Sequence, residues 1–268
     1  MSIELDRVTA LIEEIAQEEV LPRFRKLADD DVHTKEGGEL VTTADRAAEA
    51  ALTARLKDLL PGSMVVGEEA VAADRKVLEL LDGEDPAWVI DPVDGTGNFA
   101  SGKAAFAVMV ALIVGGRTQA GWIHDPIAGR TGVAEAGGGA FMAGERLQVR
   151  EAVPLVEMTG TLHASSYAPK VIADRVAAAR DMVKALPSRH CAGLEYLSLA
   201  TGEMSFTLFT RLMPWDHAPG ILLHSEAGGY SACFDGTPYG ARRHREIGVL
   251  MSPDRASWME LEETLLRP

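Results

Sequence analysis

The chain has 268 residues, of which 47% are hydrophobic and 25% are charged, and this composition excludes an intrinsically disordered protein. The 26 Lys and Arg residues against 40 Asp and Glu residues give a formal net charge of −14. That charge argues against a nucleic-acid partner and against docking on an anionic membrane, because both need a basic surface. The two cysteines, Cys191 and Cys233, are too few for a disulfide framework and fit a reducing compartment.

The N-terminal segment predicts an amphipathic helix and not a targeting signal. Apolar residues recur close to the helical period over residues 2–27, with charged residues between them. The segment lacks the basic start and the uninterrupted apolar block of a secretory signal. Since no apolar run is long enough to span a bilayer, we expect a cytoplasmic protein with no membrane partner.

The next elements are expected to alternate between helix and strand. A polar loop at residues 30–40 precedes a helix over residues 44–60, for which Thr43 is the predicted N-cap. Apolar runs at residues 64–66 and 88–90 predict buried strands that end in acidic loops. Four segments separated by glycine-rich turns predict an antiparallel meander: residues 106–114, 119–124, 132–135 and 140–142.

The pattern changes after about residue 152. The segments that follow predict a strand at 159–164, helices at 171–185 and 194–201, a strand at 206–209, a helix at 218–227, a strand at 247–251 and a helix at 253–266. Such alternation favours an α/β arrangement. We therefore predict an N-terminal α+β half at residues 1–152, with most of the metal ligands, and a C-terminal α/β half at residues 153–268.

The most informative motif is the segment Asp91-Pro92-Val93-Asp94-Gly95-Thr96. An apolar strand delivers two carboxylates, three residues apart, onto a loop that proline and glycine constrain. Asp-Gly alone is an ordinary turn signal. Two acids followed by a segment with free N–H groups are, in combination, what a site for a hard cation and a phosphate needs.

Three other acidic segments each have an ordinary structural explanation. The pair after Gly67, Glu68 and Glu69, fits the solvated end of a strand. Asp216 fits the N-cap of the helix expected at residue 218. Asp45 in a first helical turn stabilises the helix dipole and needs no further role. Taken one by one, these segments predict no function.

Together the motifs resemble one family. Gly67-Glu68-Glu69, the Asp91–Thr96 segment and Trp215-Asp216, followed by Glu226-Ala227-Gly228-Gly229, are similar in order and spacing to the signatures of the inositol monophosphatase family. Members of this family are magnesium-dependent, lithium-sensitive phosphomonoesterases. The resemblance covers nearly the whole chain. It implies a layered α/β/α/β/α sandwich of the inositol monophosphatase and fructose-1,6-bisphosphatase type, usually a homodimer, with the site between its two halves.

The resemblance also implies a role for individual residues in a site with two to three Mg²⁺ ions. The implied metal ligands are Glu68, Asp91, the carbonyl oxygen of Val93, Asp94 and Asp216, with Asp91 bridging two ions and a third ion on Glu68 and water. Asp45 and Thr96 would orient the attacking water. The N–H groups of Gly95 and Thr96 would bind phosphate oxygens.

The expected substrate is a small phosphate monoester, with inositol 1-phosphate as the nearest model. Histidinol phosphate, fructose 1,6-bisphosphate and 3′-phosphoadenosine 5′-phosphate stay open as alternatives. A different class of function, a non-catalytic binding or regulatory module, also stays open. A module that had lost catalysis is expected to lack at least one of the acidic ligands, and none is missing here, which favours an enzyme.

One position departs from the family pattern. Phe209 stands where typical members carry a Glu that contacts inositol, so we expect weak selectivity for myo-inositol. An aromatic ring cannot accept hydrogen bonds from ring hydroxyls. The alternative is that Glu195 or Glu203 fills the same space. His217, although it is adjacent to Asp216, is expected to be a structural histidine.

Overall fold

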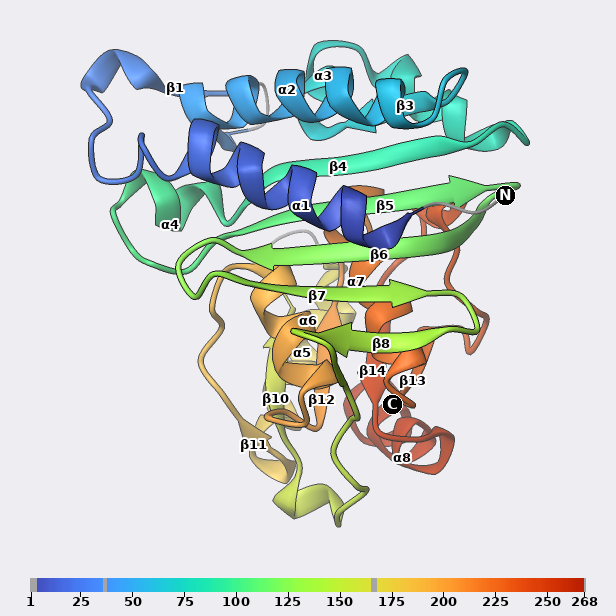
Figure 1. Cartoon of the computed structure of the whole chain (residues 1–268). Coiled ribbons are helices and arrows are strands. Elements are labelled where there is room, and N and C mark those ends of the chain that lie inside the picture. Colours follow the sequence, from blue (N-terminus) through green and yellow to red (C-terminus); the bar gives the residue numbers. More distant parts are fainter. Residues whose placement is uncertain (1–3, 36–37, 165–167, 268) are drawn as a thin grey trace.

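The computed structural model describes residues 4–35, 38–164 and 168–267, and its layers run helix, sheet, helix, sheet, helix (Figure 1). Helices α1 (Leu5–Ile15) and α2 (Thr43–Leu59) cover one face of a seven-stranded sheet. Helices α6 (Ala192–Ala200) and α7 (Pro214–Glu226) lie between its other face and a five-stranded sheet. The outer face of that second sheet carries α5 (Lys170–Ala178) and α8 (Arg255–Leu265). The predicted fold class is therefore confirmed.

The seven-stranded sheet contains the predicted meander. Its strands lie in chain order, and only the first pair is parallel. The strands are β3 (Met64–Gly67), β4 (Ala87–Asp94), β5 (Ala107–Val114), β6 (Arg117–Asp125), β7 (Arg130–Glu135), β8 (Gly139–Met142) and β9 (Glu145–Arg146). The pairing of β4 with β5 shifts register between Asp91 and Asp94. This irregularity lets the strand deliver both carboxylates of the motif at its end.

The five-stranded sheet is mixed. Its order is β11-β10-β12-β14-β13, with the first three strands parallel and the last two antiparallel to their neighbours. The strands are β10 (Thr159–His163), β11 (Lys184–Ala185), β12 (Phe206–Phe209), β13 (Tyr230–Cys233) and β14 (Val249–Ser252). The predictions missed β11 and β13. All strands of the seven-stranded sheet precede residue 152, and all strands of the five-stranded sheet follow it. A division into two halves at that residue stays a prediction.

The core sits on both faces of the large sheet. Alternate residues of β5 point to opposite sides, so Val108 and Val110 pack with α1 and α2, while Met109 packs with α6 and α7. Each fully buried large apolar side chain contributes roughly 1.5–3 kcal/mol. Helix α7 lies close to β6 because Gly121 has no Cβ: a methyl group there would be 2.8 Å from the Pro219 Cα atom. This close contact fixes the height of α7, and with it Asp216, above the sheet.

The N-terminal predictions need three corrections. Residues 2–3 of the predicted helix lie outside the described residues, and the helix ends at Val20, after a π-helical turn (Ala16–Val20), instead of at residue 27. Pro22 has no N–H to continue it. The N-cap of α2 is Thr42, not Thr43, because the Asp45 carboxylate at the third helical position accepts from the Thr42 N–H and completes a capping box.

The loop predicted at residues 30–40 is partly regular. Strands β1 (Val32–Thr34) and β2 (Leu40–Thr42) form an antiparallel pair, and residues 36–37 lie outside the described residues. Short helices that the sequence did not predict are α3 (Glu68–Ala73) and the 3₁₀ segments Asp29–Asp31, Arg75–Asp82, Leu155–Glu157, Arg180–Met182 and Ala241–Arg243. The short helix expected after Gly95 is present as α4 (Thr96–Ala100).

Two C-terminal helices differ from their predicted bounds by more than two residues. Helix α5 ends at Ala178, since the chain then turns to form β11 at the edge of the sheet. Helix α7 begins at Pro214, four residues before the predicted start, with Met213 at the cap position. Proline favours a first helical position because no N–H is needed there. Asp216 is therefore inside the first turn of α7, and its predicted role as N-cap is wrong.

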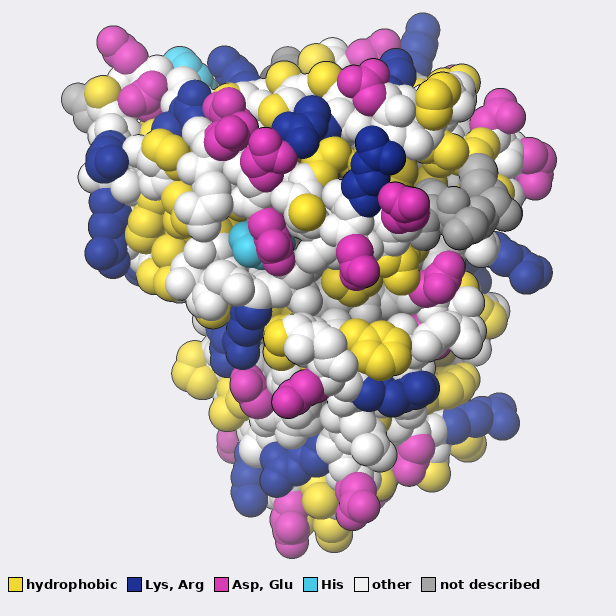
Figure 2. Space-filling view, in the orientation of Figure 1, with side chains coloured by type: hydrophobic (Ala, Val, Ile, Leu, Met, Phe, Trp, Pro, Cys, Tyr) yellow, Lys and Arg dark blue, Asp and Glu magenta, His cyan; other side chains and the backbone are white. Residues whose placement is uncertain are grey.

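No helix among the described residues is both long enough and apolar enough to cross a membrane. Acidic and basic side chains are interspersed over the face of the molecule in Figure 2.

Candidate active site

The acids of three separate motifs line one cavity of about 230 Å³. Glu68 begins α3, Asp91 and Asp94 end β4, and Asp216 lies in the first turn of α7. Val93, Gly95 and Thr96 line the same cavity. The structure therefore brings together the residues that the sequence singled out as metal ligands and phosphate contacts.

Gly95 makes the sharp turn from β4 into α4. Its φ of +87° is in the left-handed region, and a Cβ there would be 2.9 Å from the Ala105 carbonyl oxygen. Only glycine fits both conditions. The turn places Asp94 on one side and Thr96 on the other, so a carboxylate and a hydroxyl face the same cavity.

Asp94 joins the end of β4 to the start of α6 through its hydrogen bonds. Its Oδ2 atom accepts from the Cys191 thiol at 3.0 Å and from the Gly193 N–H at 2.6 Å, both near the start of α6. Burial raises the pKa of Asp94 to about 6, although these hydrogen bonds oppose the shift. The carboxylate is thus held in a fixed direction even without a cation.

Asp45 and Thr96 form a hydrogen-bonded pair. The Thr96 hydroxyl lies 3.1 Å from Asp45 Oδ1 and 3.0 Å from the Val93 carbonyl oxygen, so its one proton can be donated to either. The other oxygen of Asp45 accepts from the Thr42 N–H at 2.8 Å and from the Thr42 hydroxyl at 2.5 Å. Asp45 is fully buried, and burial raises its pKa. The two residues predicted to share a water are therefore in direct contact.

The buried acids repel one another. Burial and then the neighbouring carboxylates, Glu68 first among them, raise the pKa of Asp91 well above its usual value. The pKa of Asp216 is raised by burial and then by Asp94. The charge of Arg211, and then a hydrogen bond between the carboxyl groups of Asp91 and Asp216, oppose the second shift. Protonation or a bound cation relieves such repulsion, so the cluster has the electrostatics of a cation site.

Sequence reasoning missed a basic residue at this cluster. The Lys35 ammonium lies 2.7 Å from Glu68 Oε1 and 2.5 Å from Glu69 Oε1. Burial alone would lower the pKa of Lys35, but the two carboxylates outweigh burial and raise it. Lys35 lies in the segment predicted as a loop, with no motif around it, so only the folded contact identifies it.

Glu49 holds the strand-to-helix turn that presents Glu68. Its carboxylate accepts from the Glu69 and Ala70 N–H groups, each at 2.8 Å, at the start of α3. A Cβ on Gly67 would be 2.3 Å from the Glu49 carboxyl carbon, so glycine is needed there. The Gly-Glu-Glu motif therefore has a structural reason for its glycine as well as for its acids.

The donor set of the cavity suits Mg²⁺. All the candidate ligands are oxygen atoms, which this ion prefers over nitrogen and sulfur. In the part of the chain that the structure describes, no three Asp, Glu, His or Cys side chains already surround a common point. Water would complete the shell of a bound ion, as is usual for Mg²⁺.

A second cavity of about 210 Å³ adjoins the first and shares Asp94, Arg211 and Asp216 with it. Its other lining residues are His163, His190, Cys191, Ala192, Phe209, Thr210 and His217. Neither acid considered as a substitute for the missing inositol contact lines it. Glu195 is fully buried behind His163, and Glu203 is half-exposed and accepts from the Ser198 hydroxyl at 2.9 Å.

His217 has a structural position, as the sequence predicted. Its Nδ1 lies 2.9 Å from the Tyr196 hydroxyl and its Nε2 lies 2.7 Å from the Arg211 carbonyl oxygen. Burial lowers the pKa of His217 to about 4. Because both ring nitrogens are engaged and the ring is neutral near pH 7, His217 has no free proton to donate.

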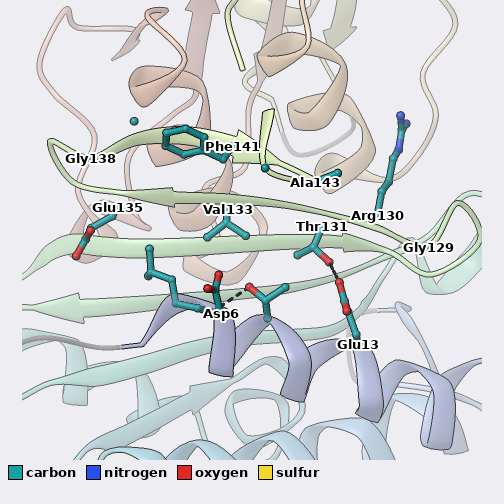
Figure 3. A pocket seen from close by; sticks show the side chains of 14 residues that line it. Asp6, Glu13, Gly129, Arg130, Thr131, Val133, Glu135, Gly138, Phe141 and Ala143 are labelled. Atoms are coloured by element: carbon teal, nitrogen blue, oxygen red, sulfur yellow. Dashed lines mark hydrogen bonds between the residues drawn. The ribbon is translucent and has the colours of Figure 1, made fainter. Parts of the chain in front are cut away.

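A separate cavity of about 450 Å³ lies between α1 and the strands β7 and β8 (Figure 3). Its acidic residues, Asp6, Glu13 and Glu135, are spread along the groove, and Thr131 donates to Glu13 at 2.7 Å. None of the motif residues lines it. Its residues therefore do not form a charge cluster like that of the candidate site.

Comparison with known proteins identifies the family of this chain. The model of the inositol monophosphatase family matches residues 4–266. The chain belongs to this family. It is 35% identical over 215 residues to an inositol-1-monophosphatase of Mesorhizobium japonicum, covering 76% of each chain. Over 210 residues it is 32% identical to the Nus factor SuhB of Escherichia coli K12, covering 75% of this chain and 74% of that one.

A solved structure of the inositol monophosphatase family has the same fold. The IMPase of Thermotoga maritima superimposes with a TM-score of 0.83 at 25% identity, over 97% of this chain and 96% of that one. Membership of the inositol monophosphatase family indicates a phosphatase. It does not identify the substrate.

Proposed function

We propose that the protein is a magnesium-dependent phosphomonoesterase that hydrolyses a small phosphate monoester with a metal-activated water. The observation that carries this proposal is the convergence of Glu68, Asp91, Asp94 and Asp216 on one cavity beside the Asp45–Thr96 pair. Family membership supports the same reaction class.

The proposed ligands follow from the family resemblance and from their positions on the cavity. Glu68, Asp91 and the carbonyl oxygen of Val93 would hold one ion, and Asp91, Asp94 and Asp216 a second. A third would be held by Glu68 and water. Bound Mg²⁺ lowers the pKa of water and neutralises charge on the attacking and leaving oxygens.

The residues around the ions would position the reactants. Asp45 is anchored by Thr42 and fixes the Thr96 hydroxyl, which we assign to orient the attacking water. The N–H groups of Gly95 and Thr96 would bind phosphate oxygens. Positioning of this kind is a large part of catalysis when the substrate is held close to its reactive geometry.

The proposed substrate is inositol-1-phosphate-like in size, with weak selectivity for inositol itself because Phe209 cannot accept a hydrogen bond. Histidinol phosphate, fructose 1,6-bisphosphate and 3′-phosphoadenosine 5′-phosphate are the other candidates. The predicted cytoplasmic location and homodimer are part of the same proposal.

One observation favours a second candidate function. A relative at 32% identity bears the name of a Nus factor, which keeps open a binding or regulatory module built on the same fold. The complete set of acids favours catalysis over this alternative, but a protein can serve both purposes.

Phosphate release from a panel of monoesters in the presence of Mg²⁺ tests the proposal. The panel contains inositol 1-phosphate, glycerol 2-phosphate, histidinol phosphate and the sugar phosphates. We expect turnover of several members and none in excess EDTA. Release from no member, by protein that stays folded, would favour the non-catalytic module.

A further inference from the structure

The second cavity of the site ends in a stack of three rings. Tyr196 and Phe209 stack with centroids 5.7 Å apart at 28°, and Phe209 and His163 stack with centroids 4.5 Å apart at 18°. Tyr196 is fully buried and Phe209 is 7% exposed, whereas the His163 side chain is 19% exposed and lines the cavity. His163 and Phe209 both line the cavity, and His163 is the more exposed of the two rings.

A buried carboxylate fixes the plane of that ring. The Nε2 atom of His163 lies 2.5 Å from Glu195 Oε2, which also accepts from the Thr161 hydroxyl at 2.6 Å. The other oxygen of Glu195 accepts from the Arg189 N–H at 2.9 Å. With one face against Phe209 and one nitrogen on Glu195, the imidazole is held on two sides before any ligand binds.

The same contacts leave Glu195 unable to serve as an acceptor for the substrate. Glu195 lies behind His163, and its oxygens are already engaged by His163, Thr161 and Arg189. Asp94 and Asp216 belong to the proposed metal cluster. The hydroxyl protons of a polyol would thus find few carboxylates, while a flat ring would find an aromatic surface of matching shape.

We propose that His163 is a stacking platform for a planar ring in the alcohol part of the substrate, so that the preferred substrates are monophosphates of the nucleoside type. This inference rests on the proposed phosphatase function and deepens it. Stacking of a base on an aromatic side chain changes affinity by about 5- to 150-fold. His163 acts here as a specificity residue and takes no part in the bond-breaking step.

A matched pair of substrates tests the platform. AMP and ribose 5-phosphate share the phosphate ester and the sugar, and only AMP carries the ring. We expect kcat/KM for AMP to exceed that for ribose 5-phosphate by about tenfold or more. The ratio of the two values does not depend on how much of a preparation is active, so it stays meaningful for a variant that folds poorly.

Two variants locate the effect. His163→Leu should bring the AMP to ribose 5-phosphate ratio close to one, and His163→Phe, which keeps a ring, should retain most of it. His190→Leu is the matched control, because His190 lines the same cavity outside the ring stack, and it should keep the wild-type ratio. Loss of the ratio in His190→Leu but not in His163→Leu would overturn the platform.

The test separates the two proposals. Equal turnover of AMP and ribose 5-phosphate would contradict the platform while leaving the phosphatase intact. The proposed function fails only if no member of the monoester panel is hydrolysed in Mg²⁺. If neither AMP nor ribose 5-phosphate is turned over, calorimetric binding of these two compounds decides the platform. Tighter binding of AMP that His163→Leu abolishes would support it, and equal binding would overturn it.

Discussion

The two adjoining cavities of the candidate site are lined by different kinds of side chain. Under the proposed function, the first cavity is the phosphate end and the second is the leaving-group end. The phosphate end collects carboxylates: two of its four proposed acidic ligands, Asp91 and Asp94, end β4, and the other two, Glu68 and Asp216, lie in the first turns of α3 and α7. The leaving-group end collects rings, and its members, His163, Tyr196 and Phe209, come from β10, α6 and β12. Under the proposed function, one local segment holds much of the phosphate end, whereas the residues of the leaving-group end are brought together only by packing between distant segments.

The two ends also differ in how their charge is balanced. At the phosphate end, neighbouring acids add to the effect of burial and raise the pKa of Asp91. At the leaving-group end, burial would also raise the pKa of Glu195, but His163 and Thr161 outweigh it and lower the pKa. Protonation or a bound cation would relieve the repulsion in the first cluster, while the second is satisfied by the protein itself. Changes at one end should leave the other unaffected.

The largest effect is expected from Asp216→Asn. This change removes one proposed ligand of the second ion and should lower kcat by about 100-fold or more on every substrate, as the loss of a strong electrostatic stabiliser does. The AMP to ribose 5-phosphate ratio should not change. Steady-state kinetics checks both statements. Asp125→Asn is the control, because Asp125 is a buried carboxyl that lines neither cavity of the site. Undiminished activity would contradict the ligand assignment.

The next effect separates roles within the phosphate end. Thr96→Ala should lower kcat by about 10- to 100-fold and change KM little, because the hydroxyl acts on the water and not on the substrate. Kinetics with one substrate at saturating Mg²⁺ measures kcat and KM separately. A rise in KM alone would instead identify Thr96 as a phosphate-binding residue.

A smaller effect concerns the leaving-group end. The wild-type protein should prefer inositol 1-phosphate over glycerol 2-phosphate by less than about 100-fold, since the acceptor for ring hydroxyls is missing. Phe209→Leu should change that preference by no more than about threefold, because neither side chain accepts a hydrogen bond. Competition between the two substrates in one reaction gives the preference directly. A value above about 100-fold in the wild-type protein would show that another group binds the inositol ring.

The smallest effect is on stability. Asp94 has its pKa raised from 3.8 to about 6 in the folded chain without metal. Stability from this group is therefore fully present below pH 3.8 and is lost as the pH rises through about 6. Added Mg²⁺ should raise the melting temperature by a few degrees at pH 7 and by less at pH 4.5. Thermal denaturation of wild-type protein and Asp94→Asn checks this, and an equal effect of Mg²⁺ at both pH values would contradict it.

Features that depend on residues close together in the sequence could be predicted, and features that depend on residues far apart could not. The Asp91–Thr96 turn depends on a proline, a glycine and a strand end within six residues, so its geometry was visible in the sequence. Lys35 reaches Glu68 across 33 positions, and Glu195 reaches His163 across 32. Neither pairing follows from spacing along the chain. The β1–β2 pair was not predicted, because each strand is only three residues long and the segment around them is mostly polar.

The central claim is that the acid cluster is a magnesium site that activates water, and the rate of phosphate release against free Mg²⁺ tests it most directly. With glycerol 2-phosphate as substrate, we predict no release in excess EDTA, full recovery on adding Mg²⁺, and a rise steeper than single-ion saturation because two ions act together. Asp216→Asn should need more Mg²⁺ and should lose the steepness, while Asp125→Asn should follow the wild-type curve. Release that persists without Mg²⁺, or a Mg²⁺ dependence that Asp216→Asn leaves unchanged, would contradict the account.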